Sequence, residues 1–532
     1  MDSNLILTFT TFLLFTGGVA FFTWYKLRKT NLNSSTGYFL GGRSLSGIVI
    51  AGSMLLTNIS TEHLIGMNGN SYVNGFIIIA WEVTSAIALV IAAIYFIPKY
   101  LKMGLTTIPQ FLENRFDGFT RTLVAIFLIV SFVVTILPIV LYSGAISIES
   151  LFGISDVLGV DKTQGLWMTV IIIGVLGSIY AIFGGLKAVA YSDTINGFGL
   201  LIGGLAIPFL ALYAIGDSSV TDGLVKVYEF APEKFNVIGG KDSVMPFEVL
   251  FTGLIINQLY FWGMNQTIIQ RALGAKNLKE AQKGLLLTGV FKILIPLVII
   301  LPGVICYYYY QETFFDKQDL VYPELVKKVL PAWMLGFFAA VILGAVLSTF
   351  NSVLNSAATL FSVGIFKRHI NKNTSDKNLV RIGKTTSAVL AIAAIFAAPM
   401  VANASDGLYQ LLQQLNGVFF IPIASILLAG FFMKKVSATA AKSALIFGLV
   451  FYIFMSWVYT SHGIHFIHLW GIEFLLNVAI MYGVSYFVPR TNMYEITDVK
   501  AVDLTTWKYT NPVSIGLCVI TIVIYILLGN NS

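Results

Sequence analysis

Charged residues are scarce in this sequence. Asp, Glu, Lys and Arg make up 11% of its 532 residues, against roughly a quarter in a typical soluble domain, whereas hydrophobic residues make up 57%. This scarcity excludes an ordinary soluble domain and predicts a protein embedded in a membrane. The formal net charge of +7 is not gathered into a basic stripe, so nucleic acid is not an expected partner.

Cysteine is also rare, and several catalytic motifs do not occur. The two cysteines, Cys306 and Cys518, lie in apolar stretches far apart in the sequence, so neither a disulfide framework nor a thiolate metal site is expected. The sequence has no GxxxxGK[ST] nucleotide-binding loop and no HExxH or CxxC metal pattern. Neither an ATP-driven pump nor an enzyme is therefore the expected function.

Apolar stretches of about 20 residues, each long enough to cross a bilayer, recur along the whole chain. They predict an all-α polytopic membrane protein with about fourteen transmembrane helices. The expected spans are 4–25, 45–68, 72–98, 121–148, 165–184, 186–216, 246–270, 284–309, 331–365, 382–401, 407–433, 439–460, 465–488 and 510–529. The longest external loop, 217–245, is too short for a separate catalytic domain, so the function must be carried out in or at the membrane.

Basic residues indicate the orientation, because cytoplasmic loops collect Lys and Arg. If the N-terminus lies outside, most of the 33 basic residues fall in cytoplasmic loops, and Lys292 lies inside a span. We therefore predict a multi-pass protein of the cell inner membrane with both termini outside.

Polar side chains inside the spans are the candidates for function. A charge at the bilayer centre costs at least about 2.5–3.5 kcal/mol, so each one needs a partner or an aqueous cavity. The polar set inside the spans comprises Asn58, Glu62, His63, Glu82, Ser85, Asp193, Asn257, Gln258, Lys292, Ser348, Thr349, Asn351, Ser352, Asn355, Gln413, Gln414 and Asn416.

The stretch AWEVTSAIAL, residues 80–89, places Glu82 and Ser85 on one helical face beside Trp81. A carboxylate, a lysine, amides and large aromatics suit a polyhydroxylated ligand, whose hydroxyls form hydrogen bonds while its ring packs on an aromatic face. The alternative is a structural ion pair between Glu82 and Lys292. His63 could contact a ligand, carry a proton or be a satisfied interior histidine.

In GAVLSTFNSVLNSAATLF, residues 344–361, Ser348, Ser352 and Asn355 recur at helical spacing on one stripe. Hydroxyls and carbonyls suit Na⁺, a hard cation that takes oxygen ligands. The alternative is small-residue packing, with each hydroxyl bonded back to its own helix.

Five segments together resemble the solute:sodium symporters, with the closest likeness to the bacterial sodium/galactose branch that includes the sodium/glucose cotransporters. The segments are TNISTEHLIGMNG, AWEVTSA, FGGLKAVAYSDTINGF, FWGMNQTIIQRALGAKN with the following EAQKG, and LSTFNSVLNSAATLF. The likeness runs in order from about residue 36 to 490. It implies a leucine-transporter-type fold with two inverted five-helix repeats around a site formed by broken helices.

The resemblance implies a division of the chain. Residues 1–44 would form an N-terminal anchor helix and a cytoplasmic loop, and 45–216 the first repeat. After the external loop 217–245, the second repeat would cover 246–433, and 434–532 would add three helices. The polar stretch at 55–70 would then be the break in the first helix of the repeat, where irregular backbone lines a cavity.

The resemblance also implies sodium ligands. The family's sodium site is matched by the carbonyls of Leu56, Ile59 and Ala345 with the hydroxyls of Ser348 and Thr349. Some members bind a second sodium ion, and the matching positions are Asp193, Ser348, Asn351 and Ser352. Asn351 departs from the hydroxyl expected there, so one or two sodium ions are expected.

The sugar site is matched unevenly. The carried-over contacts are Glu82, Ser85, Lys292 and Gln413, with Asn58 as a further contact; His63, Trp81 and Gln258 replace the glutamine, tyrosine and asparagine of the galactose site. Met67, Trp81 and Tyr409 would form the outer gate and Phe261 the inner one. Because His63 and Lys292 could place two donors around an anionic group, a uronate stays open beside a neutral hexose.

We therefore expect a sodium-coupled symporter that imports a sugar, such as galactose or glucose, by alternating access. An anionic sugar or another small organic solute is the alternative substrate, and a ligand-sensing transceptor is the alternative class. Proton coupling would use Glu62 and His63. The expected partners are a sugar or sugar acid, sodium ions and the lipid bilayer, with a homodimer as an open alternative.

Overall fold

Helices account for almost all regular structure in the computed structural model, which describes residues 3–28, 32–403, 408–490 and 494–529. Within these ranges no β-strand is named, and one isolated bridge joins Leu45 to Ala275. The predicted all-α membrane fold is confirmed.

Eleven helices in the described ranges are long and apolar enough to cross a membrane. The count reaches twelve when Leu278–Leu294 and Pro296–Tyr310, bent by 44°, are taken as one span. The predicted number of fourteen is not confirmed, because 45–68 and 246–270 are each divided between two shorter helices.

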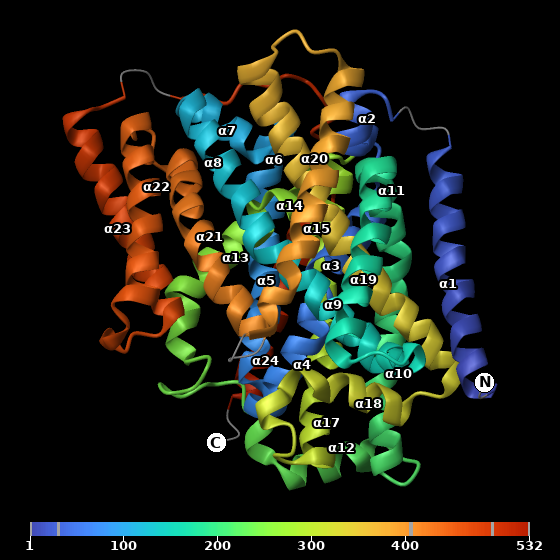
Figure 1. Ribbon diagram of the computed structural model, residues 1–532. Helices are drawn as coiled ribbons and strands as arrows, with labels where there is room; N and C mark the ends of the chain where they lie inside the picture. The colour runs from blue at the N-terminus through green and yellow to red at the C-terminus, as the bar shows by residue number, and fades with distance from the viewer. Residues whose placement is uncertain (1–2, 29–31, 404–407, 491–493, 530–532) are drawn as a thin grey trace.

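Up to Ile215, the described part of the chain contains eleven α-helices (Figure 1). They are α1 Ser3–Leu27, α2 Ser35–Leu40, α3 Gly47–Asn58, α4 Thr61–Asn74, α5 Ala80–Ile91, α6 Ile97–Lys102, α7 Ile108–Arg115, α8 Gly118–Ser131, α9 Leu137–Phe152, α10 Ile154–Leu158 and α11 Lys162–Ile215.

The described residues after Ile215 contain thirteen further α-helices. They are α12 Val220–Phe230, α13 Gly253–Gly263, α14 Gln266–Leu273, α15 Leu278–Leu294, α16 Pro296–Ile299, α17 Leu301–Tyr310, α18 Val321–Val329, α19 Ala332–Thr359, α20 Asp376–Ala397, α21 Leu408–Phe432, α22 Ala438–Ile453, α23 Phe466–Phe487 and α24 Thr510–Leu528. Short helical turns, including η7 Phe315–Leu320, join some of them.

Polar side chains define where several helices begin. Asp117 accepts a hydrogen bond from the Thr120 amide (2.8 Å) at the start of α8, and Asn277 accepts one from the Glu280 amide (2.9 Å) at α15. These caps satisfy amide groups that a helix start leaves unpaired.

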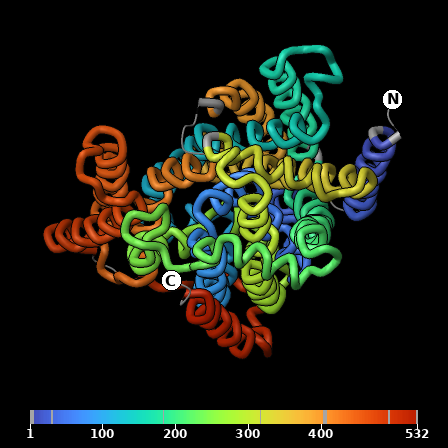
Figure 2. Tube along the Cα trace, turned by 90° about the horizontal axis from the view of Figure 1, so that it is seen from below, coloured from blue at the N-terminus to red at the C-terminus, as the bar shows by residue number. Residues whose placement is uncertain are grey.

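The centre and the edge of the bundle differ in burial. Figure 2 shows α1 at one edge, α22 and α23 at the opposite edge, and α24 at a third, around a central group of helices. The most apolar windows of α1 and α24 are only 17% buried, whereas those of α19 and α21 are 72% buried. The peripheral helices therefore present their apolar faces to lipid, and the polar site lies among the central ones.

Both ends of the chain lie at the end of the bundle that carries α12 and α18 (Figure 1). The Thr8 hydroxyl of α1 donates to the Ala332 carbonyl at the start of α19 (3.0 Å), and Gly529 lies against Ile238 in the connection after α12. The start of α1 and the end of α24 therefore lie at the same end of the bundle.

One glycine makes the turn that divides α11 into two spans. Gly185 has φ +59° and ψ −170°, and a Cβ there would lie 2.7 Å from the Tyr38 carbonyl oxygen. Both the backbone conformation and the close approach require glycine.

We expect Gly185→Ala to destabilise the protein by about 1–3 kcal/mol, because alanine would be strained and would collide with the Tyr38 carbonyl. Thermal unfolding in detergent would measure the loss. Gly483→Ala on α23 is the matched control, since a Cβ there meets nothing within 4 Å. Equal melting temperatures for the two variants would contradict the assignment.

Candidate functional site

A cavity of about 60 Å³, measured as the space open to the centres of water-sized molecules, lies among the central helices. Its lining comes from α3, α4, α5, α13, α14, α15, α19 and α21. It includes Asn58, Glu62, His63, Trp81, Glu82, Ser85, Asn257, Gln258, Phe261, Lys292, Thr349, Tyr409, Gln413 and Asn416. Most of the predicted sugar contacts, which are far apart in sequence, are therefore brought to one place.

The break between α3 and α4 supplies one side of the cavity. Ile59 and Ser60 leave the helical conformation, with ψ of 81° and −169°, and the chain resumes a helix at Thr61. The last carbonyls of α3 consequently lack helical amide donors, and the first amides of α4 lack acceptors. Such groups are tolerated at membrane depth only where protein or a cavity surrounds them.

The ion pair between Glu82 and Lys292, which the sequence left open as the alternative to a sugar contact, is present. The two side chains are each 1% exposed and in direct contact, and Lys292 Nζ also donates to Asn58 Oδ1 at 2.7 Å. This pair joins α5, α15 and the end of α3. Because the ammonium is neutralised by one carboxylate and bonded to an amide, it is not a free cation in the cavity.

The side-chain amide of Gln258 is fixed by hydrogen bonds to its neighbours. Its Oε1 accepts from Ser85 Oγ (3.0 Å) and Trp262 Nε1 (3.1 Å), while its Nε2 donates to the Trp81 carbonyl (2.8 Å). The amide thus fixes α13 against α5 and sets the position of Trp81.

Aromatic rings close one end of the cavity. Tyr409 contacts His63 and Trp81 with ring centroids 5.2 Å and 5.8 Å apart, and its hydroxyl accepts from Gln413 Nε2 (2.7 Å). Met67 is fully buried but does not border the cavity. His63 Nδ1 has no hydrogen-bond partner among the described residues and lies 3.8 Å from Glu62 Oε1.

Residues of the turn η7 pack beyond these rings. In η7, Asp319 Oδ2 accepts from the Leu408 amide at the start of α21 (3.3 Å), and Gly69 of α4 allows the backbone of Gln318 and Asp319 to approach. Burial raises the pKa of Asp319 to about 6. The turn η7 therefore packs α4 against α21 on the side where the cavity is closed.

The opposite end of the cavity reaches the second helix break. α13 ends at Gly263 and α14 starts at Gln266, with Asn265 Oδ1 accepting from the Thr267 amide at 2.9 Å. Phe261 stands on the wall at this end. Asn265 and Thr267 also line the cavity, which extends past Phe261 along α14.

The predicted residues of the first sodium site meet where α3 ends against α19. Leu56, Ile59 and Ala345 are fully buried, and Thr349 Oγ1 donates to the Thr57 carbonyl at 3.0 Å. Ser348 Oγ has no partner within the described residues. Oxygen atoms from two helices are thus gathered beside the break.

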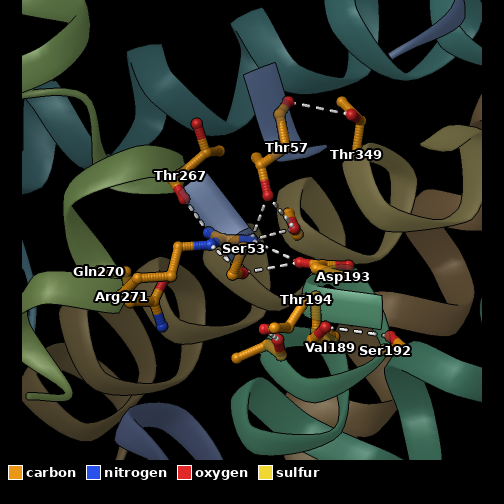
Figure 3. A network of polar contacts seen from close by, with 12 residues as sticks. Ser53, Thr57, Val189, Ser192, Asp193, Thr194, Thr267, Gln270, Arg271 and Thr349 are labelled. Atoms are coloured by element: carbon orange, nitrogen blue, oxygen red, sulfur yellow. Dashed lines mark hydrogen bonds and ion pairs between the residues drawn. The ribbon is translucent and has the colours of Figure 1, made fainter. Parts of the chain in front are cut away.

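Arg271 of α14 occupies the centre of a second polar network (Figure 3). Its guanidinium donates to Ser53 Oγ (3.1 Å), Thr57 Oγ1 (2.9 Å) and Ser352 Oγ, and lies 3.9 Å from Asp193 Oδ2. Arg271 and Asp193 are fully buried. Two of the predicted ligands of a second sodium ion, Asp193 and Ser352, are therefore engaged by a cationic side chain.

Sequence reasoning missed Arg271 and Ser53. The predicted span 246–270 ends one residue before Arg271, so Arg271 falls in the cytoplasmic loop that follows it. One signal was available. Arg271 lies in the segment QTIIQRAL, whose apolar residues fall on one helical face, and this pattern indicates a helix packed against the protein.

The comparisons with known proteins agree with this geometry. A model of the sodium:solute symporter family matches residues 38–448. The chain is 44% identical over 525 residues to an uncharacterized symporter, YidK, of Escherichia coli K12, covering 99% of this chain and 91% of that protein. It is 30% identical over 529 residues to a sodium/glucose cotransporter of Vibrio parahaemolyticus, covering 95% of this chain and 94% of that protein.

Solved structures show the same fold. A substrate-bound, outward-open Na⁺-coupled sialic acid symporter matches with a TM-score of 0.74 at 19% identity, over 92% of this chain and 99% of that one. Mhp1, a nucleobase-cation-symport-1 family transporter, matches with a TM-score of 0.54 at 14% identity, over 86% and 95%. The fold is the leucine-transporter type, and the chain belongs to the sodium:solute symporter family.

Proposed function

We propose that the protein is a sodium-coupled importer of a neutral sugar, a hexose such as galactose or glucose, in the cell inner membrane. The observation that carries this proposal is the buried Glu82–Lys292 pair with Asn58 in a cavity walled by Trp81. Paired donors and acceptors beside an aromatic face suit sugar hydroxyls and a sugar ring.

The charge of the cavity favours a neutral sugar over a uronate. Glu62 and Glu82 both border it, and among the described lining residues Lys292 and His63 are the only groups that can carry a positive charge. Lys292 is already paired with Glu82, and His63 Nδ1 lies 3.8 Å from Glu62 Oε1, so each group that can carry a positive charge already faces a carboxylate of the protein. Burying the carboxylate of a uronate there is costly.

The transport cycle follows from the two ends of the cavity. Sodium, driven inward by its gradient and by about 2.3 kcal/mol per charge per 100 mV, would stabilise an outward-open state. Trp81 and Tyr409, with Met67 behind them, would close the outer side, and Phe261 would move to release the sugar inward. The repeats 45–216 and 246–433 would rock against each other around this site.

Sodium would bind where the carbonyls of Leu56, Ile59 and Ala345 meet the hydroxyls of Ser348 and Thr349. The buried Ser348 hydroxyl and the Thr349 hydroxyl, which donates to the Thr57 carbonyl beside the helix break, support this place. Oxygen ligands without a fixed carboxylate suit a monovalent cation.

We expect purified protein in liposomes to accumulate galactose or glucose, and not glucuronate, under an inward sodium gradient. Glu82→Gln should reduce hexose uptake about 100-fold, because the site loses a charged acceptor and Lys292 is left unpaired. The same variant should gain affinity for glucuronate, since its cavity becomes more cationic. Uptake of labelled sugars measures both effects.

Glu473→Gln is the matched control, because Glu473 is equally buried but lies on α23 away from the cavity. It should retain hexose uptake. Accumulation of glucuronate alone by the unmodified protein would overturn the neutral-sugar assignment. It would not affect the assignment of the chain to the symporter family.

Thr349→Ala should raise the sodium concentration for half-maximal uptake about tenfold, through loss of one oxygen ligand. The maximal rate at saturating sodium should change less. Thr385→Ala on α20, an exposed threonine bonded to its own helix, is the control. An unchanged sodium dependence in Thr349→Ala would place the ion elsewhere.

A further inference from the structure

An apolar groove lies on the side of the bundle, towards the end opposite the one that carries α12 and α18 (Figure 1). It is bordered by α8, by α20 and by η8 Leu360–Ile370, which continues α19. The space open to the centres of water-sized molecules is about 600 Å³, against about 60 Å³ in the central cavity. We call it the α20 groove. It shares no lining residue with the central cavity, so it is a separate site.

The walls of the α20 groove are apolar and face the membrane. Phe361 and Phe366 of η8 and Leu390 of α20 are among its lining residues. Ile370 and Val389, which also line it, are 63% and 58% exposed. An exposed apolar surface of this kind marks a contact with another molecule or with lipid. Because α20 belongs to a candidate membrane span, Asp376–Val401, a hydrocarbon chain is the expected occupant.

One wall of the groove has an unusual helical geometry. η8 is π-helical over its 11 residues, and the Asn371 amide after it donates to the Phe366 carbonyl, five residues back, at 3.0 Å. The π-helix is rare and is frequently found at functional sites. η8 is continuous with α19, which carries Thr349 of the proposed sodium site. The groove therefore borders a helix on which the proposed function depends.

Arg381 is the one charged side chain among the described residues that line the α20 groove. It is exposed, and its guanidinium makes no hydrogen bond or ion pair within the described part of the chain. Arg381 and Leu390 lie roughly 13 Å apart along α20, at about 1.5 Å per residue. One leaflet contributes about 15 Å to the hydrocarbon core of a bilayer. The guanidinium is thus placed at the headgroup of a lipid whose acyl chain fills the groove.

The surroundings of Arg381 are basic. Residues 367–384 contain one acidic residue, Asp376, and the basic residues Lys367, Arg368, Lys372, Lys377, Arg381 and Lys384. Asp376 accepts a hydrogen bond from the Ser35 amide (3.0 Å). Glu113 of α7 pairs with Arg121 and Arg368. These carboxylates are engaged elsewhere, so Arg381 is left for an external anion, and a guanidinium binds phosphate through two parallel hydrogen bonds.

We propose that the α20 groove binds an anionic phospholipid, with one acyl chain between α8, η8 and α20 and the phosphate group on Arg381. A zwitterionic lipid offers the same chain, but its headgroup has no net negative charge, so the basic surroundings favour an anionic lipid. The bound lipid joins η8 to α20 and supports the helix that carries Thr349. This proposal rests on the fold and is independent of the proposed substrate.

Phosphatidylglycerol with a photoreactive diazirine in its acyl chain tests the site in the purified full-length protein. After irradiation in lipid–detergent micelles, the label should map to peptides covering residues 361–370 and 381–390. Arg381→Gln should reduce this labelling about fivefold, the effect of one basic side chain on binding to an anionic lipid surface. Because Arg381 is exposed, the melting temperature should not change.

Lys372→Gln is the matched control, because it removes the same charge from an exposed position that does not line the groove. It should leave the labelling nearly unchanged. Arg381→Lys, which keeps the charge, should recover most of the labelling that Arg381→Gln loses. Phosphatidylcholine with the same chain should label the two peptides about fivefold less than phosphatidylglycerol does.

Three results would overturn the proposal. Equal labelling by phosphatidylcholine, or an equal loss in Lys372→Gln, would show that the lipid is not selected by Arg381. Labelling confined to other helices would show that the groove is not the binding site. Displacement of the label by an equal concentration of inorganic phosphate would assign Arg381 to a free anion instead of a lipid.

Discussion

Backbone polar groups and charged side chains at membrane depth must find their hydrogen-bond and ion-pair partners inside the protein. This constraint shapes the whole site. The break at Ile59 and Ser60 frees carbonyl and amide groups where no water of the bulk phase is available. Side chains of α19 approach the freed groups, and the Thr349 hydroxyl donates to the Thr57 carbonyl. A helix that breaks in the membrane thus requires oxygen-rich partners, and the same oxygens can hold a cation.

In the proposed function, the end of α3 connects the ion to the sugar. Thr57 and Asn58 are consecutive, yet they face different partners: Thr57 contacts Thr349 and Arg271, whereas Asn58 receives a hydrogen bond from Lys292. Ordering this single turn by a cation would position Asn58, and with it the Glu82–Lys292 pair. Sodium and sugar are coupled in this account because they share one short piece of backbone.

Much of this arrangement could be predicted from the sequence. The features that could not be predicted were missed for physical reasons. Low charge and long apolar runs predicted the all-α membrane fold, and the cost of an unpaired charge left a Glu82–Lys292 ion pair open as the alternative that the structure contains. The number of spans could not be obtained the same way, because half-helices such as α3 and α14 are shorter than a bilayer. Arg271 was assigned to a loop because the predicted span ended at residue 270. The resemblance supplied expected positions for sodium ligands, but it could not foresee that an arginine engages Asp193 and Ser352.

Hydrogen–deuterium exchange with and without sodium tests the central claim most directly. The purified protein would be compared in Na⁺ and in K⁺ at equal ionic strength, without sugar, and exchange would be followed in peptides covering residues 55–63 and 345–352. Sodium should slow exchange in both peptides, because it bridges the end of α3 to α19 and orders the break. Equal exchange in the two salts at 55–63, with protection confined to other helices, would contradict the claim that sodium organises this turn.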